Sequence, residues 1–396
     1  MTTEPTTRLA PTLIALGLGA FAIGVSEFAA MGLLPYYADG FGVSEPAAGH
    51  AISGYALGVV IGAPVLAVLL ARFPRKAVLA SLIAVFGIAN LLGAIAPSMN
   101  LLTTTRVLSG LPHGAYLGIA MLFAADLLPK GQRAKGVARV LLGLTLANVI
   151  GVPLASAIGQ SIGWRSLFVI VAVLAAASAT MILRVAPDPA PAEGASPMRE
   201  LAALKNRAVW LTLAVGAVGF GGVFAAYSYF SAAMIESASA PAWAIPLGLS
   251  AFGVGATFGN EIAGRLASWS RMGGTLVLLS GMVATTLLYA AVMGNWPLMV
   301  LSILLLGSTA GLVVPLQMRL MDVAGEAQTL AAALNHAAFN FANALGPFAA
   351  GLALSAGMGW SATGLVGATL SALGIVVLAI AWTDGKRQGG LAVPAE

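Results

Sequence analysis

A single carboxylic acid, Glu27, interrupts the otherwise uncharged apolar stretch of residues 11–34. A stretch of about 20 apolar residues is long enough to cross a bilayer as a helix. An ionisable side chain at that depth is energetically costly, and it usually marks a proton site, an ion site or a partner for a cation. Glu27 is therefore the first candidate for chemistry: a carboxyl group that takes up a proton on one side of a membrane and releases it on the other.

Two further ionisable side chains, Arg106 and His113, lie within the apolar stretch of residues 101–125. At 1.5 Å per residue, Arg106 reaches a depth that agrees with that of Glu27 to within one helical turn, so the two could meet. His113 follows seven residues later on the same helical face, near the middle of the membrane, where an imidazole can relay protons or bind a substrate. The alternatives are a static ion pair or a protonated carboxyl group in a polar pocket for Glu27, and a neutral imidazole bonded to a helix backbone for His113.

A polar face recurs on the stretch of residues 328–354. It consists of the following five residues: Asn335, His336, Phe339, Asn340 and Asn343. Amide and imidazole groups in hydrocarbon seek polar partners, so this face is expected to point into the protein. It could bind a substrate through hydrogen bonds, or it could hold helices together.

An aromatic face is expected on residues 208–232, where Phe220, Phe224 and Tyr227 recur at helical spacing. Such a face suits an uncharged or amphipathic ligand. The alternative is a packing or lipid-facing surface. Tyr227 is the strongest candidate of the three, because its hydroxyl group needs a partner when it is buried.

The composition predicts a polytopic α-helical membrane protein. Of the residues, 59% are hydrophobic and 8% are charged, and the mean hydropathy is +0.94, whereas soluble domains carry about 25% charged residues. The net charge of +5 is spread over short loops, which does not indicate nucleic-acid binding. The absence of cysteine excludes disulfides and thiol chemistry. We find no metal-ligand spacing, GxSxG or P-loop, so we expect neither a metal, a cofactor nor enzymatic activity.

Twelve apolar stretches are long enough to span a membrane. They cover residues 11–34, 47–70, 77–96, 101–125, 138–159, 166–185, 208–232, 243–266, 273–293, 297–318, 328–354 and 361–382. The longest connection between them is polar and rich in Pro and Ala, and it divides the stretches six and six. The expected organisation is an N-terminal bundle (residues 1–185), a linker (residues 186–207) and a C-terminal bundle (residues 208–396).

The basic residues predict the orientation. With the N-terminus in the cytoplasm, all of the 19 Lys and Arg residues except Arg106 and Arg165 fall on the cytoplasmic side. This is the bias expected of a protein in the bacterial cell (inner) membrane with both termini in the cytoplasm.

The two halves share sequence motifs. GAPVLAVLLAR at 62–72 matches GNEIAGRLASW at 259–269, and ANVIGVP at 147–153 matches ANALGPF at 342–348 with nearly the same separation. Parallel six-helix repeats with a site between them are typical of secondary transporters. The alternative is a chance similarity between glycine-rich helices.

On these motifs the chain resembles the major facilitator superfamily. Within it, the resemblance is to bacterial twelve-helix drug:proton antiporters of the arabinose-efflux or sugar-efflux and chloramphenicol-resistance type. It rests on the segments GVSEFAAMGLLP (24–35), HAISGYALGVVIGAPVLAVLLARFPRK (50–76), RVLSGLPHGAY (106–116), GLTLANVIGVPLASAIGQSIGWRSLF (143–168), VPLQMRLM (314–321) and FNFANALGP (339–347). The fold that it implies is two parallel six-helix bundles.

The family's loop motif GxLaDrxGrr is altered in this chain. Ala71 stands at the aspartate position and Pro74 at the second glycine, while the basic positions of the motif remain. We expect the cytoplasmic gate of the first half to depend on the remaining basic side chains and a candidate acidic partner: Arg72, Arg75, Lys76 and Asp126.

Two further motifs concern helix packing. The family's RxxxGxxxG motif is present as Arg106, Gly110 and Gly114, and a variant antiporter motif contains Asn148, Gly151 and Pro153. Glycines on one face allow helices to approach closely, and a proline inside a helix bends it.

The resemblance implies a secondary active transporter that exports a small organic molecule, such as a drug, in exchange for protons by alternating access. The alternative is proton-coupled uptake of a sugar, a nucleoside or a similar metabolite. The expected partners are the substrate, protons and the lipid bilayer, with no nucleic acid. The expected unit is a monomer driven by the proton gradient.

Overall fold

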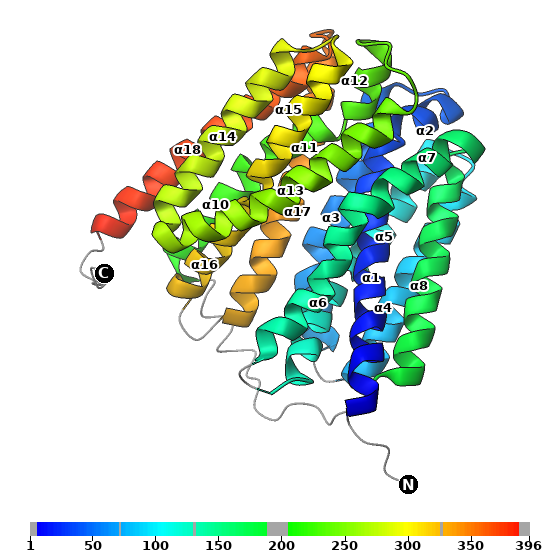
Figure 1. Cartoon of the computed structure of the whole chain (residues 1–396), viewed down its shortest axis with the longest axis vertical. Helices are drawn as coiled ribbons and strands as arrows, with labels where there is room; N and C mark the ends of the chain where they lie inside the picture. Colours follow the sequence, from blue (N-terminus) through cyan, green and yellow to red (C-terminus); the bar gives the residue numbers. More distant parts are fainter. Residues whose placement is uncertain (1–5, 71–72, 130–131, 188–204, 325–327, 388–396) are drawn as a thin grey trace.

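The protein is described by a computed structural model over residues 6–70, 73–129, 132–187, 205–324 and 328–387 (Figure 1). Within these ranges all regular structure is helical, as the composition predicts. Most of the predicted linker, residues 188–204, and the N-terminal and C-terminal tails lie outside the described residues.

The elements before the predicted linker run as follows: α1 (Thr6–Gly32), α2 (Leu34–Phe41), α3 (Glu45–Leu70), α4 (Arg75–Ala94), α5 (Met99–Asp126), α6 (Arg133–Leu146), the π-helical turn η2 (Ala147–Gly151), α7 (Val152–Ile162) and α8 (Arg165–Val185). The predicted stretch of residues 138–159 is therefore divided among three elements, α6, η2 and α7.

The elements after the predicted linker run as follows: α10 (Arg207–Gly219), α11 (Gly221–Tyr227), α12 (Phe230–Glu236), α13 (Ala244–Trp269), α14 (Arg271–Ala291), α15 (Trp296–Thr309), the 3-10 turn η4 (Ala310–Leu312), α16 (Val313–Val323), α17 (Gln328–Ser355) and α18 (Ser361–Arg387). We call the end of the bundle where α1 begins and α3 ends the terminal face. The other end, where α2 and α12 lie side by side, is the opposite face (Figure 1).

The described residues contain 11 helical segments that are long and apolar enough to cross a membrane. The remaining predicted stretch, residues 243–266, lies in α13, a helix of 26 residues. This helix carries Glu261 and Arg265, whose side chains pair across one turn and reduce its apolar character. The structure thus has the helical membrane architecture expected from the sequence.

Most helix contacts stay on one side of the linker in the sequence. In the first half α3 packs on α5, and α4 packs on α8. In the second half α13 packs on α15, and α14 packs on α18. The main contacts between the two sets of helices are those of α3 with α17 and of α13 with η2 and α7. Smaller contacts between the two sets join α1 and α2 to α12, α5 to α17, and α1 to α13.

Glycines allow the close contact of α3 with α5. A Cβ atom added at Gly110 would overlap the carbonyl oxygen of Tyr55, and one at Gly114 would lie 2.5 Å from the Cβ of Ala63. Both positions belong to the RxxxGxxxG motif, and both lie in this contact. The spacing of four residues therefore places two glycines on the face that meets α3.

Pro153 and the turn before it interrupt the helix formed by α6 and α7. Proline has no N–H group, and its ring clashes with the carbonyl group four residues earlier, here that of Val149. The chain adopts the wider π-helical turn η2 over residues 147–151, which ends two residues before this proline. The predicted irregularity is therefore present, in the form of a π turn.

Candidate functional site

A polar network inside the first half fixes the guanidinium group of Arg106, which is 2% exposed. Its Nη1 donates to the Ser26 hydroxyl at 2.8 Å, and its Nη2 donates to the Ser26 carbonyl oxygen at 3.2 Å. The Ser26 hydroxyl in turn donates to Oδ1 of Asn90 at 2.8 Å. The network joins α1, α4 and α5, and it holds the charge of Arg106 next to the peptide that precedes Glu27.

The sequence predicts that Arg106 and Glu27 could meet, and in the structure the two side chains interact electrostatically. The hydrogen bonds of Arg106, however, go to Ser26, and Glu27 takes its hydrogen bond from another helix. Helical spacing sets the depth of a side chain along the membrane but does not set which of two adjacent residues it reaches.

The carboxyl group of Glu27 lies at a contact between the two sets of helices. It is 8% exposed, and its Oε1 accepts a hydrogen bond from Nδ2 of Asn343 on α17 at 2.8 Å. Oδ1 of Asn343 is buried and has no hydrogen-bond partner among the residues that the structure describes. A buried acceptor without a partner is destabilising, so this pair is not fully satisfied in the geometry of the structure.

A second polar connection between the two sets of helices passes through two histidines. The guanidinium group of Arg106 lies 4.0 Å from the centre of the Tyr55 ring, a cation–π arrangement. The Tyr55 hydroxyl lies 2.9 Å from Nδ1 of His113, and Nε2 of His113 lies 3.4 Å from Nε2 of His336 on α17. The tyrosine and histidine groups can each donate or accept, depending on their protons. A chain of polar groups therefore runs from α5 through α3 and back to α5, and ends at α17.

The other two amides of the polar face on α17 make local contacts. Nδ2 of Asn335 donates to Oε1 of Gln317 on α16 at 2.8 Å. Nδ2 of Asn340 donates to the carbonyl oxygen of His336 at 3.0 Å, and its Oδ1 is buried without a partner in the described part of the chain. Of the three asparagines predicted for this face, Asn343 is the one that bonds to Glu27.

The predicted aromatic residues of the second half lie in contact with one another. Phe220 and Phe224 pack edge to face with ring centres 5.4 Å apart, and Phe220 packs on Phe339 at 4.7 Å. Tyr227 packs on Phe252 of α13 at 4.3 Å. The aromatic face is therefore buried within the second set of helices in this structure.

Phe28 of α1 extends the aromatic face into the first half. Its ring lies 6.4 Å from that of Phe224 and 6.0 Å from that of Tyr227. Phe28 directly follows Glu27 in the sequence. The aromatic group and the carboxyl group are thus held by the same turn of α1.

The predicted gate residues lie at the terminal face. Arg75, at the start of α4, forms an ion pair with Asp126, at the end of α5, as the sequence suggests. Arg271 and Asp322 form a second ion pair at the same face, between α14 and α16. In both pairs the partners are 51 residues apart, so the second half repeats the pair of the first half. Arg72 lies outside the described residues, and Lys76 follows Arg75 as the second residue of α4.

The residues of the variant antiporter motif form part of the contact with α13. Nδ2 of Asn148 donates to the carbonyl oxygen of Leu144 at 3.2 Å. The backbone of Asn148 lies close to Gly253 of α13. A Cβ atom added at Gly253 would be 2.5 Å from the Asn148 carbonyl oxygen. Gly151 faces α1 and packs against Phe21 and Val25. The π turn therefore lies between α1 and α13.

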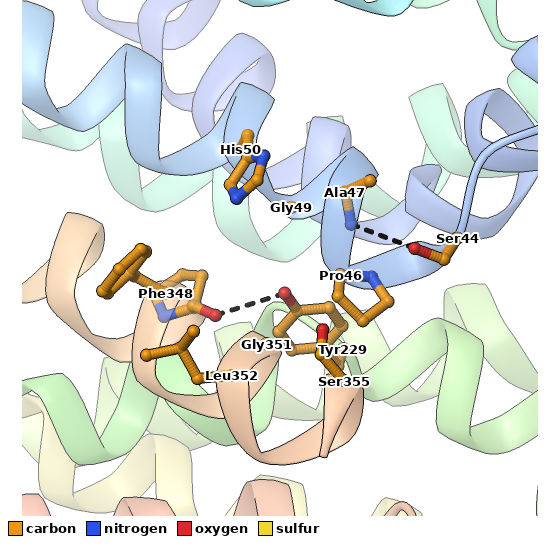
Figure 2. Close-up of a pocket in the computed structure, with 11 residues that line it drawn as sticks. Ser44, Pro46, Ala47, Gly49, His50, Tyr229, Phe348, Gly351, Leu352 and Ser355 are labelled. Atoms are coloured by element: carbon orange, nitrogen blue, oxygen red, sulfur yellow. Dashed lines mark hydrogen bonds between the residues drawn. The ribbon is translucent and has the colours of Figure 1, made fainter. Parts of the chain in front are cut away.

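At the opposite face, the ring of Tyr229 lies between α3 and α17. A Cβ atom at Gly49 of α3 would overlap its hydroxyl group, and one at Gly351 of α17 would lie 2.7 Å from it. The hydroxyl group donates to the carbonyl oxygen of Pro347 at 3.2 Å. Figure 2 shows Tyr229 and the two glycines around a pocket at the surface, with the exposed His50 at its rim. The two sets of helices thus meet closely at this face.

Several contributors to the site were not predicted, among them Ser26, Tyr55, Asn90, Phe28 and Phe252. Two of them carried a signal in the sequence. Asn90 is the one amide in residues 77–96, and Tyr55 is the one aromatic residue in residues 47–70. The two phenylalanines carried none, because an aromatic residue in an apolar helix is common.

Within the described ranges, no group of three or more acidic or histidine side chains could hold a metal ion.

Comparisons with known proteins agree with this architecture. The family model described as Major Facilitator Superfamily matches residues 16–322. The inner membrane transport protein YdhP of Escherichia coli (strain K12) is 38% identical over 368 residues, which cover 92% of this chain and 94% of that protein. A chloramphenicol resistance protein of Streptomyces lividans is 32% identical over 86% of this chain and 88% of its own.

A solved structure has the same fold. A crystallised mutant of the nucleoside transporter NupG superposes with a TM-score of 0.76 at 15% identity, covering 95% of this chain and 99% of that one. At this level of identity the likeness concerns the fold alone.

Proposed function

This chain belongs to the Major Facilitator Superfamily, and from that premise we propose that it exports a small organic molecule in exchange for protons. Alternating access between the two sides of the membrane is the motion that couples the two fluxes. The basic residues favour a cytoplasmic position for the terminal face. The protein would then act in the bacterial inner membrane as a monomer, and the proton gradient would drive it.

The observation that carries the proposal is the position of Glu27. Its carboxyl group is buried, and it bonds to Asn343 across the contact between the two sets of helices. Adding or removing a proton there changes both the charge and the hydrogen bonding of that contact. A proton bound at this point therefore alters the relative stability of the conformations that the two sets can adopt.

The aromatic residues beside Glu27 are the proposed substrate contacts. Phe28 links the acidic turn of α1 to Phe224 and Tyr227, and these rings offer apolar surface with a hydroxyl group. Such a surface favours an uncharged or amphipathic molecule. The relative named for chloramphenicol resistance supports a substrate of this kind and an outward direction of transport.

The experiment is a transport assay with the purified protein in liposomes that contain a pH-sensitive dye. A panel of amphenicols, other antibiotics, sugars and nucleosides is applied as an outward gradient with no initial pH difference. Exchange predicts that movement of the substrate out of the liposome acidifies the lumen. Alkalinisation of the lumen would instead indicate uptake by symport, and no pH change with any transported compound would refute proton coupling.

A further inference from the structure

We propose that Asn343 senses the protonation state of Glu27 and converts it into a change in the contact between α1 and α17. The inference rests on the proposed function, because it assumes that Glu27 exchanges protons during transport. It adds a role for a residue that is not itself titratable. Asn343 would position the two sets of helices, and it would not carry the proton.

The geometry gives Asn343 one satisfied and one unsatisfied group. Its Nδ2 donates to Oε1 of Glu27 at 2.8 Å, whereas its Oδ1 is buried and accepts from no donor in the described ranges. A carboxylate has only acceptors. Ionised Glu27 therefore cannot supply the donor that Oδ1 lacks, and the contact keeps an unpaired acceptor as long as Glu27 is charged.

Protonation of Glu27 supplies the missing donor. A carboxylic acid has one O–H donor and one carbonyl acceptor, and a primary amide has the same complementary pair. The acid O–H can donate to Oδ1 of Asn343 while Nδ2 donates to the other carboxyl oxygen. The proton comes from water and is bound at a carboxyl oxygen, and no other bond is broken. The contact then has two hydrogen bonds and no unpaired acceptor at Asn343.

The other titratable groups near Glu27 are fixed by partners of their own. Arg106 of α5 and Tyr55 of α3 both interact electrostatically with Glu27. The guanidinium group of Arg106 bonds to Ser26, and the Tyr55 hydroxyl bonds to His113. His336 lies on α17 itself and contacts His113. In the described structure, none of these groups supplies a donor to Oδ1 of Asn343.

The sign of the effect follows from these hydrogen bonds. Protonated Glu27 stabilises the contact of α1 with α17, which belongs to the conformation that is closed at the opposite face. Ionised Glu27 weakens this contact and favours separation. If the opposite face is the outside, binding of an external proton favours closure toward the outside, and release of the proton favours opening.

The test measures closure directly as a function of pH. The chain has no cysteine, so the exposed Ser161 and Ser355 can be replaced by cysteine and spin-labelled without other changes. Distances between the two labels are measured in nanodiscs from about pH 5 to about pH 9, a range that lies above the titration of exposed carboxyl groups and covers that of buried ones. We expect the ratio of closed to open protein to fall about fivefold or more with rising pH, because one buried hydrogen bond is lost.

Three variants separate the possibilities. Glu27→Gln should remove the pH response, because its amide can pair with Asn343 at every pH. Asn343→Leu should also remove it, although Glu27 still titrates. Asn343→Asp has almost the same shape as the wild type and so guards against misfolding. It should move the transition to higher pH, since two adjacent carboxylates repel each other unless one holds a proton.

The outcomes are distinguishable from failure of the proposed function. If Asn343→Leu or Asn343→Asp keeps the wild-type pH response while Glu27→Gln loses it, the role of Asn343 is refuted and Glu27 remains the proton site. If Glu27→Gln keeps the pH response, both this inference and the role of Glu27 in proton coupling are refuted. The matched control is Asn340→Ala. Asn340 lies about one turn from Asn343 on α17 and bonds to the His336 backbone instead of to Glu27. This variant should keep the pH response, and loss of the pH response in it would also overturn the inference.

Discussion

Replacement of Gly253 by alanine should shift the protein away from the conformation described above. Gly253 of α13 faces the backbone of η2, and an added Cβ would lie 2.5 Å from the carbonyl oxygen and 2.7 Å from the carbonyl carbon of Asn148. Ordinary contacts of a Cβ atom begin near 3.4 Å. Because the neighbour is main chain, no side chain can rotate away, and α13 must move from η2 by about 1 Å.

The magnitude of this effect follows from the cost of overpacking. Extra methyl groups in a close contact cost roughly 1–3 kcal/mol. This energy destabilises the conformation in which α13 touches η2 relative to one in which they separate. At 1.4 kcal/mol per factor of ten, the population ratio changes about 5-fold to 150-fold. The variant should therefore sample the separated conformation far more often than the wild type.

The assay uses spin labels at the opposite face, on cysteines that replace Ser161 at the end of α7 and Ala242 before α13. Gly253→Ala should increase the fraction of long distances. Gly264→Ala is the matched control, because it lies on the same helix and an added Cβ there meets no atom of the described residues within 4 Å. Equal distance distributions for Gly253→Ala and the wild type would refute the reasoning, and so would an equal shift in the control.

Two further predictions concern the polar network. Arg106→Ala should reduce transport and stability more than Arg165→Ala, because Arg106 is buried and holds Ser26, while Arg165 is exposed and bonds to the Ala96 carbonyl oxygen at the surface. The measurements are the melting temperature and the transport rate of each variant. Equal values for Arg106→Ala and Arg165→Ala would contradict the prediction. Simultaneous protonation of His113 and His336 would place two charges 3.4 Å apart, a repulsion of about 5 kcal/mol at an effective dielectric constant near 20. Strong acid should thus separate α5 from α17, and His336→Gln should abolish that acid-induced step in the distance measurement.

The sequence predicted the helices well, because transmembrane helices have an unambiguous hydrophobic signal. The membrane-spanning class follows from length and composition, and each predicted stretch lies in a helical region of the structure, although residues 138–159, 208–232 and 297–318 are each divided among three elements. The ion pair of Arg75 with Asp126 was also anticipated, since one residue begins a helix and the other ends a helix at the same face. Its counterpart, Arg271 with Asp322, was not predicted, although the same spacing in the second half carries the signal.

The pairing of individual side chains was less predictable. Helical spacing gave the depths of Glu27 and Arg106, but rotamers decide that Arg106 bonds to Ser26. The bond between Glu27 and Asn343 depends on how α1 and α17 meet across the two halves, and no local pattern specifies that contact. Pro153 indicated an irregular helix, whereas the π-helical form of the turn depends on the neighbours of η2 on α1 and α13.

The role of Glu27 in proton coupling is tested most directly by Glu27→Gln in liposomes with an imposed pH gradient. Glutamine keeps the size of the side chain and its bond to Asn343, and it removes the titratable proton. We predict that the variant folds and still exchanges labelled substrate for unlabelled substrate across the membrane, but no longer concentrates it when a pH gradient is applied. Gradient-driven accumulation equal to that of the wild type would contradict the assignment of Glu27 as the proton site.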